Sequence, residues 1–138
     1  MFECLILGDS IAVGTSHVLP NCISFSKGGI NTWQWNKMYG NERKEFASEV
    51  VIISLGTNDH KGVKTFDELV KMRNKVNAKR IYWIMPPCNE SFCKPNVNDW
   101  VKQIASKNGD FIIGTQRLQK DNIHPSTAGY KEIASQVR

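Results

Sequence analysis

Five short apolar runs are the feature that most constrains the fold of this 138-residue chain. They fall at residues 3–8, 22–26, 50–56, 80–85 and 110–114, and β-branched residues recur in them. Their polarity barely alternates, which is typical of strands that helices cover on both faces of a parallel sheet. We therefore expect five buried strands.

Helix-like segments lie between and after these runs, at residues 10–19, 41–48, 66–77, 96–107 and 126–137. Asn96 and Ser126 are candidate N-caps, and Gly109 follows the fourth segment as a C-terminal cap would. The alternation predicts one α/β domain over residues 1–138, because the chain is long enough for a single core. We expect three layers with right-handed crossovers and a flavodoxin-like strand order of 2-1-3-4-5.

Composition excludes several classes of protein. With 41% apolar and 22% charged residues, the chain is typical of a globular domain. Its longest apolar run falls far short of the roughly 20 residues that a membrane-spanning helix needs. The net charge of +5 comes from scattered lysines and arginines, so we expect no nucleic-acid partner. The sequence leaves the oligomeric state open.

The cysteines lack the paired spacing of a zinc site, and we expect reduced thiols. Cys4 and Cys22 fall in expected strands and are interpreted as small buried residues. Whether Cys88 and Cys93 pair is left open. The opening residues, "MFECLILGDS", lack a basic leader and a small-residue cleavage site, which predicts a cytoplasmic protein.

Polar motifs follow four of the five expected strands. They are "GDS" at 8–10, "KGGINT" at 27–32, "GTNDH" at 56–60 and "DNIHP" at 121–125. The carboxyl ends of parallel strands share one edge of a sheet, so these motifs converge there. Together they contain a hydroxyl, an imidazole, a carboxylate and oxyanion donors, the chemical types that acyl transfer by a serine requires.

In order and spacing, these motifs resemble the signature blocks of the SGNH/GDSL hydrolase family. The resemblance spans residues 8–124, which is most of the chain. It implies a flavodoxin-like domain that hydrolyses esters or thioesters by a Ser-His-Asp mechanism, with no metal or organic cofactor.

Carried over residue by residue, the resemblance implies that Ser10 is the nucleophile, His124 the general base and Asp121 the carboxylate that orients it. The oxyanion donors would be the backbone N–H of Ser10, that of Gly29 and the side-chain amide of Asn58. Gly28 is the alternative to Gly29. The residues expected to contact substrate are Asp9, Gly28, Trp33 and His60, although Asp9 is also expected to tie adjacent loops together.

Each assignment has a structural alternative. Ser10 could merely cap a helix, Asn58 could be a turn residue, and His17 is expected to be a packing residue within the first helix. "GDSIAVGTS" differs from a phosphate-binding loop, because it has five residues between its glycines and Thr15 where the lysine belongs. A flavin mononucleotide site would leave the Asp-x-x-His pair unexplained.

Short connections leave little chain for a lid or an acyl tunnel, so we expect a small acyl group. An acetyl ester on a carbohydrate is the leading hypothesis, in an open groove lined by Trp33, Trp35 and "PPCNESFCKP" at 86–95. A lipid-ester or acyl-thioester hydrolase is one alternative. A catalytically inactive carbohydrate-binding or structural module is the other.

Overall fold

A five-stranded, fully parallel sheet forms the centre of the protein. The computed structural model describes residues 3–138 and has the strand order β2-β1-β3-β4-β5, which confirms the predicted fold class and order. The strands are β1 (Cys4–Gly8), β2 (Ile23–Ser26), β3 (Phe46–Ser54), β4 (Val76–Ile84) and β5 (Phe111–Ile113).

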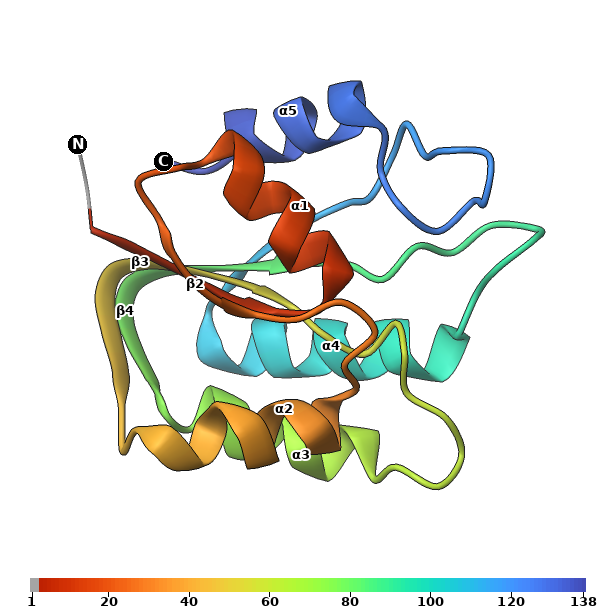
Figure 1. Cartoon of the computed structure of the whole chain (residues 1–138). Helices are drawn as coiled ribbons and strands as arrows, with labels where there is room; N and C mark the ends of the chain where they lie inside the picture. The colour runs from red at the N-terminus through yellow and green to blue at the C-terminus, as the bar shows by residue number, and fades with distance from the viewer. Residues whose placement is uncertain (1–2) are drawn as a thin grey trace.

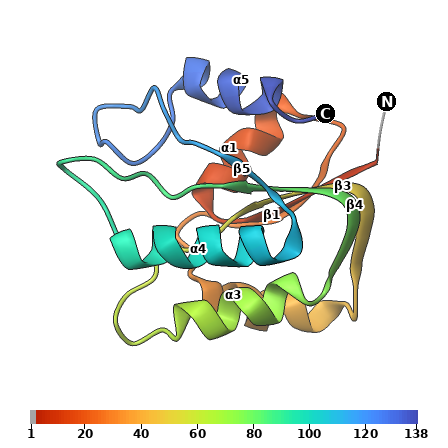
Figure 2. The ribbon, with the colours of Figure 1, turned by 180° about the vertical axis from the view of Figure 1, so that it is seen from behind.

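Helices cover both faces of this sheet, which explains why the strands are apolar on both sides. One face carries α1 (Ser10–Val18) and α5 (Thr127–Ser135), and the other carries α2 (Thr32–Met38), α3 (Thr65–Arg73) and α4 (Pro95–Asn108) (Figures 1 and 2). Within residues 3–138, no helix has the length and apolarity to cross a membrane.

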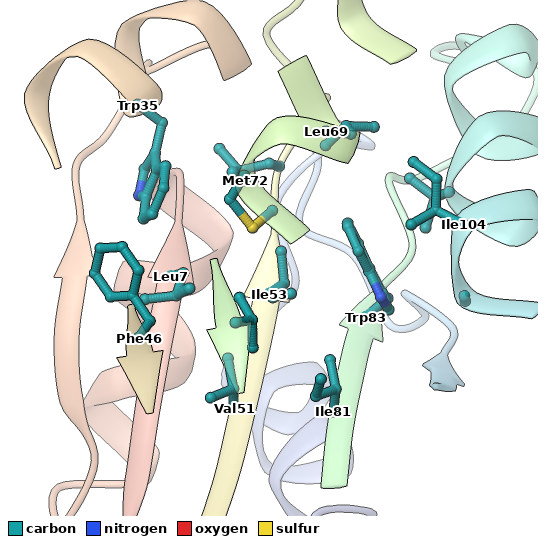
Figure 3. Packing of buried hydrophobic residues seen from close by; sticks show 14 of the residues in the cluster. Leu7, Trp35, Phe46, Val51, Ile53, Leu69, Met72, Ile81, Trp83 and Ile104 are labelled. Atoms are coloured by element: carbon teal, nitrogen blue, oxygen red, sulfur yellow. The ribbon is translucent and has the colours of Figure 1, made fainter. Parts of the chain in front are cut away.

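The larger apolar core lies between the sheet and α2, α3 and α4. Figure 3 shows Trp83 and Ile53 pointing from the sheet toward Met72 and Leu69 of α3. Trp35 belongs to this core, where it is 0% exposed and its Nε1 donates to the carbonyl of Phe25 at 2.8 Å. The expectation that Trp35 lines an open groove is therefore wrong.

The second helix lies elsewhere than predicted. No α-helix occupies 41–48; α2 begins at Thr32 and a 3₁₀ turn follows at Gly40–Glu42. Asn31 and Gln34 form a reciprocal capping box that sets the start of α2, a signal present in the sequence but not recognised.

Two caps are confirmed and one is wrong. Ser126 caps α5, and Gly109 ends α4 with a φ of 72°. The fourth helix begins at Pro95, so its N-cap is Lys94 rather than Asn96. Proline favours the first helical position because its fixed φ suits a helix and its missing N–H needs no partner there.

All four cysteines are paired, contrary to the expectation of reduced thiols. One disulfide joins Cys4 to Cys22, and the other joins Cys88 to Cys93. The first links the start of β1 to the residue before β2, because pairing of these neighbouring strands brings the two Cα atoms to 4.5 Å. The pairing that the sequence left open, between Cys88 and Cys93, closes the loop after β4.

Candidate active site

Ser10 occupies the first turn of α1, immediately after β1. Gly8 makes this tight junction possible, because its φ is 151° and a Cβ there would lie 1.8 Å from the carbonyl oxygen of Ser54. Asp9 is the N-cap of α1, and its Oδ1 accepts a hydrogen bond from the N–H of Ile11 at 3.0 Å. Since Asp9 caps the helix, the hydroxyl of Ser10 is not needed for that role.

Asp9 is buried, not a substrate contact. It is 0% exposed, so the expectation that it meets substrate is wrong, whereas the expected hydrogen bond to a backbone amide is present. Its Oδ1 also accepts from the hydroxyl of Ser54 at 3.1 Å. Burial raises the pKa of Asp9 to about 7, although these hydrogen bonds act in the opposite direction.

His124 bridges Ser10 and Asp121. Its Nε2 lies 2.9 Å from the Oγ of Ser10, and its Nδ1 lies 2.6 Å from the Oδ2 of Asp121. An ionised carboxylate only accepts hydrogen bonds, so Nδ1 carries the hydrogen and Nε2 is left to accept the hydroxyl proton of Ser10. The structure thus brings together the three residues that the sequence assigned to the reaction.

Asp121 is held in its ionised form by its surroundings. The hydrogen bond from His124 and those from the backbone N–H groups of Ile123 and His124 lower the pKa of Asp121 to about 2. These two backbone bonds, at 2.9 and 3.0 Å, also fix the carboxylate within its own loop. The loop is folded tightly on itself, because Asn122 has a φ of 58°.

Gly28 lies beside the serine, and Gly29 follows it in the loop after β2. A Cβ added to Gly28 would lie 3.9 Å from the Cβ of Ser10, so this glycine borders the site directly. Gly29 has a φ of 76°, a conformation that favours glycine. The glycine pair therefore lets the backbone approach Ser10 and turn sharply.

Asn58 is joined to the glycine loop. Its Nδ2 donates to the carbonyl oxygen of Ile30 at 3.0 Å, and Ile30 directly follows Gly29. The side chain therefore holds the loop after β3 against the loop after β2. An amide nitrogen carries two hydrogens, so this bond uses one of them.

Asp59 is a buried brace that the sequence interpretation missed. Its Oδ1 accepts from the N–H of Thr32 at 2.9 Å, and its Oδ2 accepts from the hydroxyls of Thr32 and Thr65 at 2.6 Å each. These bonds tie the starts of α2 and α3 to the Asn58 turn. The "GTND" motif contains Asp59, but only the fold reveals its two threonine partners.

Trp33 and His60 line a hollow of about 530 Å³ between the start of α2 and the 60–64 loop. Trp33 is 50% exposed, which contrasts with buried Trp35. Polar side chains complete the lining, among them Asn31, Lys64 and Glu68. The hollow thus combines one aromatic surface with several hydrogen-bonding groups.

Comparison with solved structures identifies the architecture. A lipase/acylhydrolase from Enterococcus faecalis aligns with a TM-score of 0.66 at 17% identity, over 100% of this chain and 98% of that one. This chain has the fold of the GDSL-like acylhydrolases. The sequence matches no protein-family model and no curated protein sequence.

Two other solved structures align over most of their length. A GDSL-like lipase from Bacteroides thetaiotaomicron has a TM-score of 0.65 at 16% identity, over 96% of this chain and 84% of its own. An acetylxylan esterase from Geobacillus stearothermophilus has a TM-score of 0.66 at 18% identity, over 97% and 91%. Variants of that esterase described as catalytic mutants, in which a histidine or a serine is replaced by alanine, also align.

Proposed function

We propose that this chain is a serine esterase of the SGNH/GDSL hydrolase family. The continuous hydrogen-bonded series from Ser10 through His124 to Asp121 carries the proposal. This series supplies a nucleophile, a base and an orienting carboxylate in the geometry that acyl transfer requires. An inactive binding or structural module would have no need of such a series.

The reaction runs in two halves. The Oγ of Ser10 attacks the ester carbonyl carbon while His124 takes the hydroxyl proton, and His124 then protonates the departing alcohol. Water next attacks the acyl-serine, giving its proton to His124, which returns a proton to Ser10 as the carboxylic acid leaves. Asp121 stays ionised throughout and stabilises the imidazolium.

Three donors would stabilise the oxyanion. The N–H of Ser10 lies in the first turn of α1, where backbone N–H groups lack partners within the helix. The second hydrogen of Asn58 Nδ2 and the N–H of Gly29 complete the set. The positive end of the α1 dipole favours the same negative charge.

The substrate class that we propose is a small acyl ester, such as an acetyl ester, on a carbohydrate. His60, which lines the hollow beside Trp33, follows Asn58 by two residues, so the Cα atoms of His60 and Asn58 lie within about 7 Å of each other. A sugar ring presents C–H groups to an aromatic face and hydroxyls to polar side chains, which suits this lining. The fold shared with an acetylxylan esterase supports the same class.

A fluorophosphonate probe tests the nucleophile directly. We expect it to label the wild type at Ser10, with labelling lost in Ser10→Ala and strongly slowed in His124→Ala. Asn58→Ala should lower kcat about a hundredfold or more, because one oxyanion donor is removed. Folded wild-type protein that stays unlabelled would instead support an inactive module.

A substrate panel tests the acyl and alcohol parts separately. p-Nitrophenyl esters of increasing chain length should be hydrolysed best at the acetyl end, and acetylated sugars should also be substrates. Trp33→Ala should raise KM for the acetylated sugars while leaving p-nitrophenyl acetate unaffected. Phe111→Ala is a matched control, since Phe111 is 52% exposed on β5; equal effects of the two variants, or a preference for long acyl chains, would contradict the carbohydrate assignment.

A further inference from the structure

The loop after β4 contacts two parts of the candidate active site: the loop that carries His124 and the turn that carries Asn58. We define the clamp as residues 88–94, which the Cys88–Cys93 disulfide closes into a ring with Lys94 next to it. Figures 1 and 2 show this loop running beside the loop that precedes α5. The clamp therefore lies where it can act on the loop that carries Asp121 and His124.

Asn89 makes the contact to that loop. Its Nδ2 donates to the carbonyl oxygen of Asn122 at 2.9 Å, and Asn122 lies between Asp121 and His124. Its Oδ1 meanwhile accepts from the backbone N–H groups of Ser91 and Phe92, at 2.9 Å each. One end of the side chain thus shapes the clamp, and the other end holds the loop of the base.

Lys94 makes the contact to the turn that carries Asn58. Its Nζ donates to the carbonyl oxygens of Thr57, at 2.8 Å, and of Asp59. These carbonyls flank Asn58, so the ammonium group holds the turn that presents the candidate oxyanion donor. The side chain is half-buried, which favours a defined geometry for these charge-assisted bonds.

We propose that Asn89 and Lys94 are positioning residues, and that the Cys88–Cys93 disulfide fixes the distance between the loop of the base and the turn of the oxyanion donor. The proposal rests on the proposed function, because it assigns His124 and Asn58 their catalytic roles. The disulfide matters because it restricts the short segment that separates Asn89 from Lys94. Opening it would let the two contacts move independently.

Asn89→Asp tests the contact to the base loop. The aspartate keeps the oxygen that accepts from Ser91 and Phe92, but it loses the N–H that Asn122 accepts. We expect kcat to fall about three- to tenfold with little change in KM, the effect of losing one ordinary hydrogen bond. Asn108→Asp is the matched control, because the Nδ2 of Asn108 donates to a backbone carbonyl within α4 at 2.8 Å.

Lys94 is tested by loss and rescue. Lys94→Met should lower kcat and slow labelling of Ser10 by the probe, whereas Lys94→Arg should restore most of both. Lys75→Met is the control, because Lys75 also donates to a backbone carbonyl, that of Gly40. A similar loss in the control, or the absence of rescue, would overturn the positioning role of Lys94.

The disulfide is tested by coupling. Cys88→Ser/Cys93→Ser should lower kcat. Asn89→Asp should then reduce kcat by a smaller factor in this double variant than in the wild type, because interacting changes are non-additive. Fully multiplicative effects would contradict the clamp. Cys4→Ser/Cys22→Ser is the control, and it should leave the effect of Asn89→Asp unchanged.

Hydrogen exchange separates this proposal from the proposed function. Asn89→Asp should speed exchange of the amides of Ile123 and His124, which bond to Asp121, whether or not the protein hydrolyses esters. An inactive wild type with this exchange response would refute only the esterase assignment. An active wild type in which Asn89→Asp changes neither exchange nor kcat would refute only the clamp.

Discussion

The buried carboxyl of Asp9 makes stability depend on pH in an unusual direction. In the unfolded chain this group titrates near 3.8, and burial raises its pKa to about 7 in the folded protein. Between these values the folded state holds a proton that the unfolded state has released. The stability that the protonated Asp9 carboxyl contributes is therefore fully present below the unfolded pKa, and it is lost as pH rises through the folded pKa.

The size of the effect follows from the shift. Each pH unit in this window changes stability by about 1.4 kcal/mol, so Asp9 contributes a loss of about 3 kcal/mol between about pH 5 and about pH 8. Asp9→Asn removes this titration while keeping the oxygen that accepts from Ile11 and Ser54. We therefore expect the unfolding free energy of Asp9→Asn, measured relative to that of the wild type, to rise by about 3 kcal/mol from about pH 5 to about pH 8.

Guanidinium unfolding of both proteins at several pH values measures the difference. The comparison isolates Asp9, because every other ionisable side chain is present in both proteins. Ser54→Ala is a useful control, because it removes one hydrogen bond to Asp9 and leaves the carboxyl in place. Parallel stability curves for the wild type and Asp9→Asn would refute the reasoning, since they would mean that the buried group ionises normally.

Three further outcomes are expected. Replacing Cys4 and Cys22 by serine should lower the unfolding free energy by about 3 kcal/mol, the chain-entropy value for a separation of 18 residues; unchanged chemical denaturation midpoints would contradict it. Gly8→Ala should lower the unfolding free energy by about 3 kcal/mol or more, because its Cβ would meet the carbonyl of Ser54. A melting temperature equal to that of the wild type would contradict this prediction. The logarithm of kcat/KM should decline with acidification at a slope of about one, because protonated His124 cannot accept a proton, and a flat profile would exclude it as the base.

The sequence predicted the central strands because burial on both faces leaves continuous apolar runs. It missed the first residues of β3 and β4, which begin at Phe46 and Val76. Polar residues such as Glu49 and Lys79 interrupt the apolar pattern there. Figure 1 shows that the first halves of β3 and β4 bend away from the rest of the sheet. Helices cover these bent halves less completely than they cover the centre of the sheet.

The residues of the candidate site were easier to predict than the contacts that support them. Short motifs identified Ser10 and His124, because their chemistry requires particular residue types at strand ends. The brace formed by Asp59 and the contact from Asn89 to Asn122 depend on loops that pack together only in the folded chain. Tertiary contacts of this kind leave no periodic pattern in a sequence.

The serine and the imidazole that face each other stand 114 positions apart in the chain. During synthesis on the ribosome, the serine is translated before the imidazole, which follows 114 residues later. A product truncated between these two residues would carry the hydroxyl without its proton acceptor. The order of the two residues along the chain therefore leaves such products without the proposed hydrolytic pair.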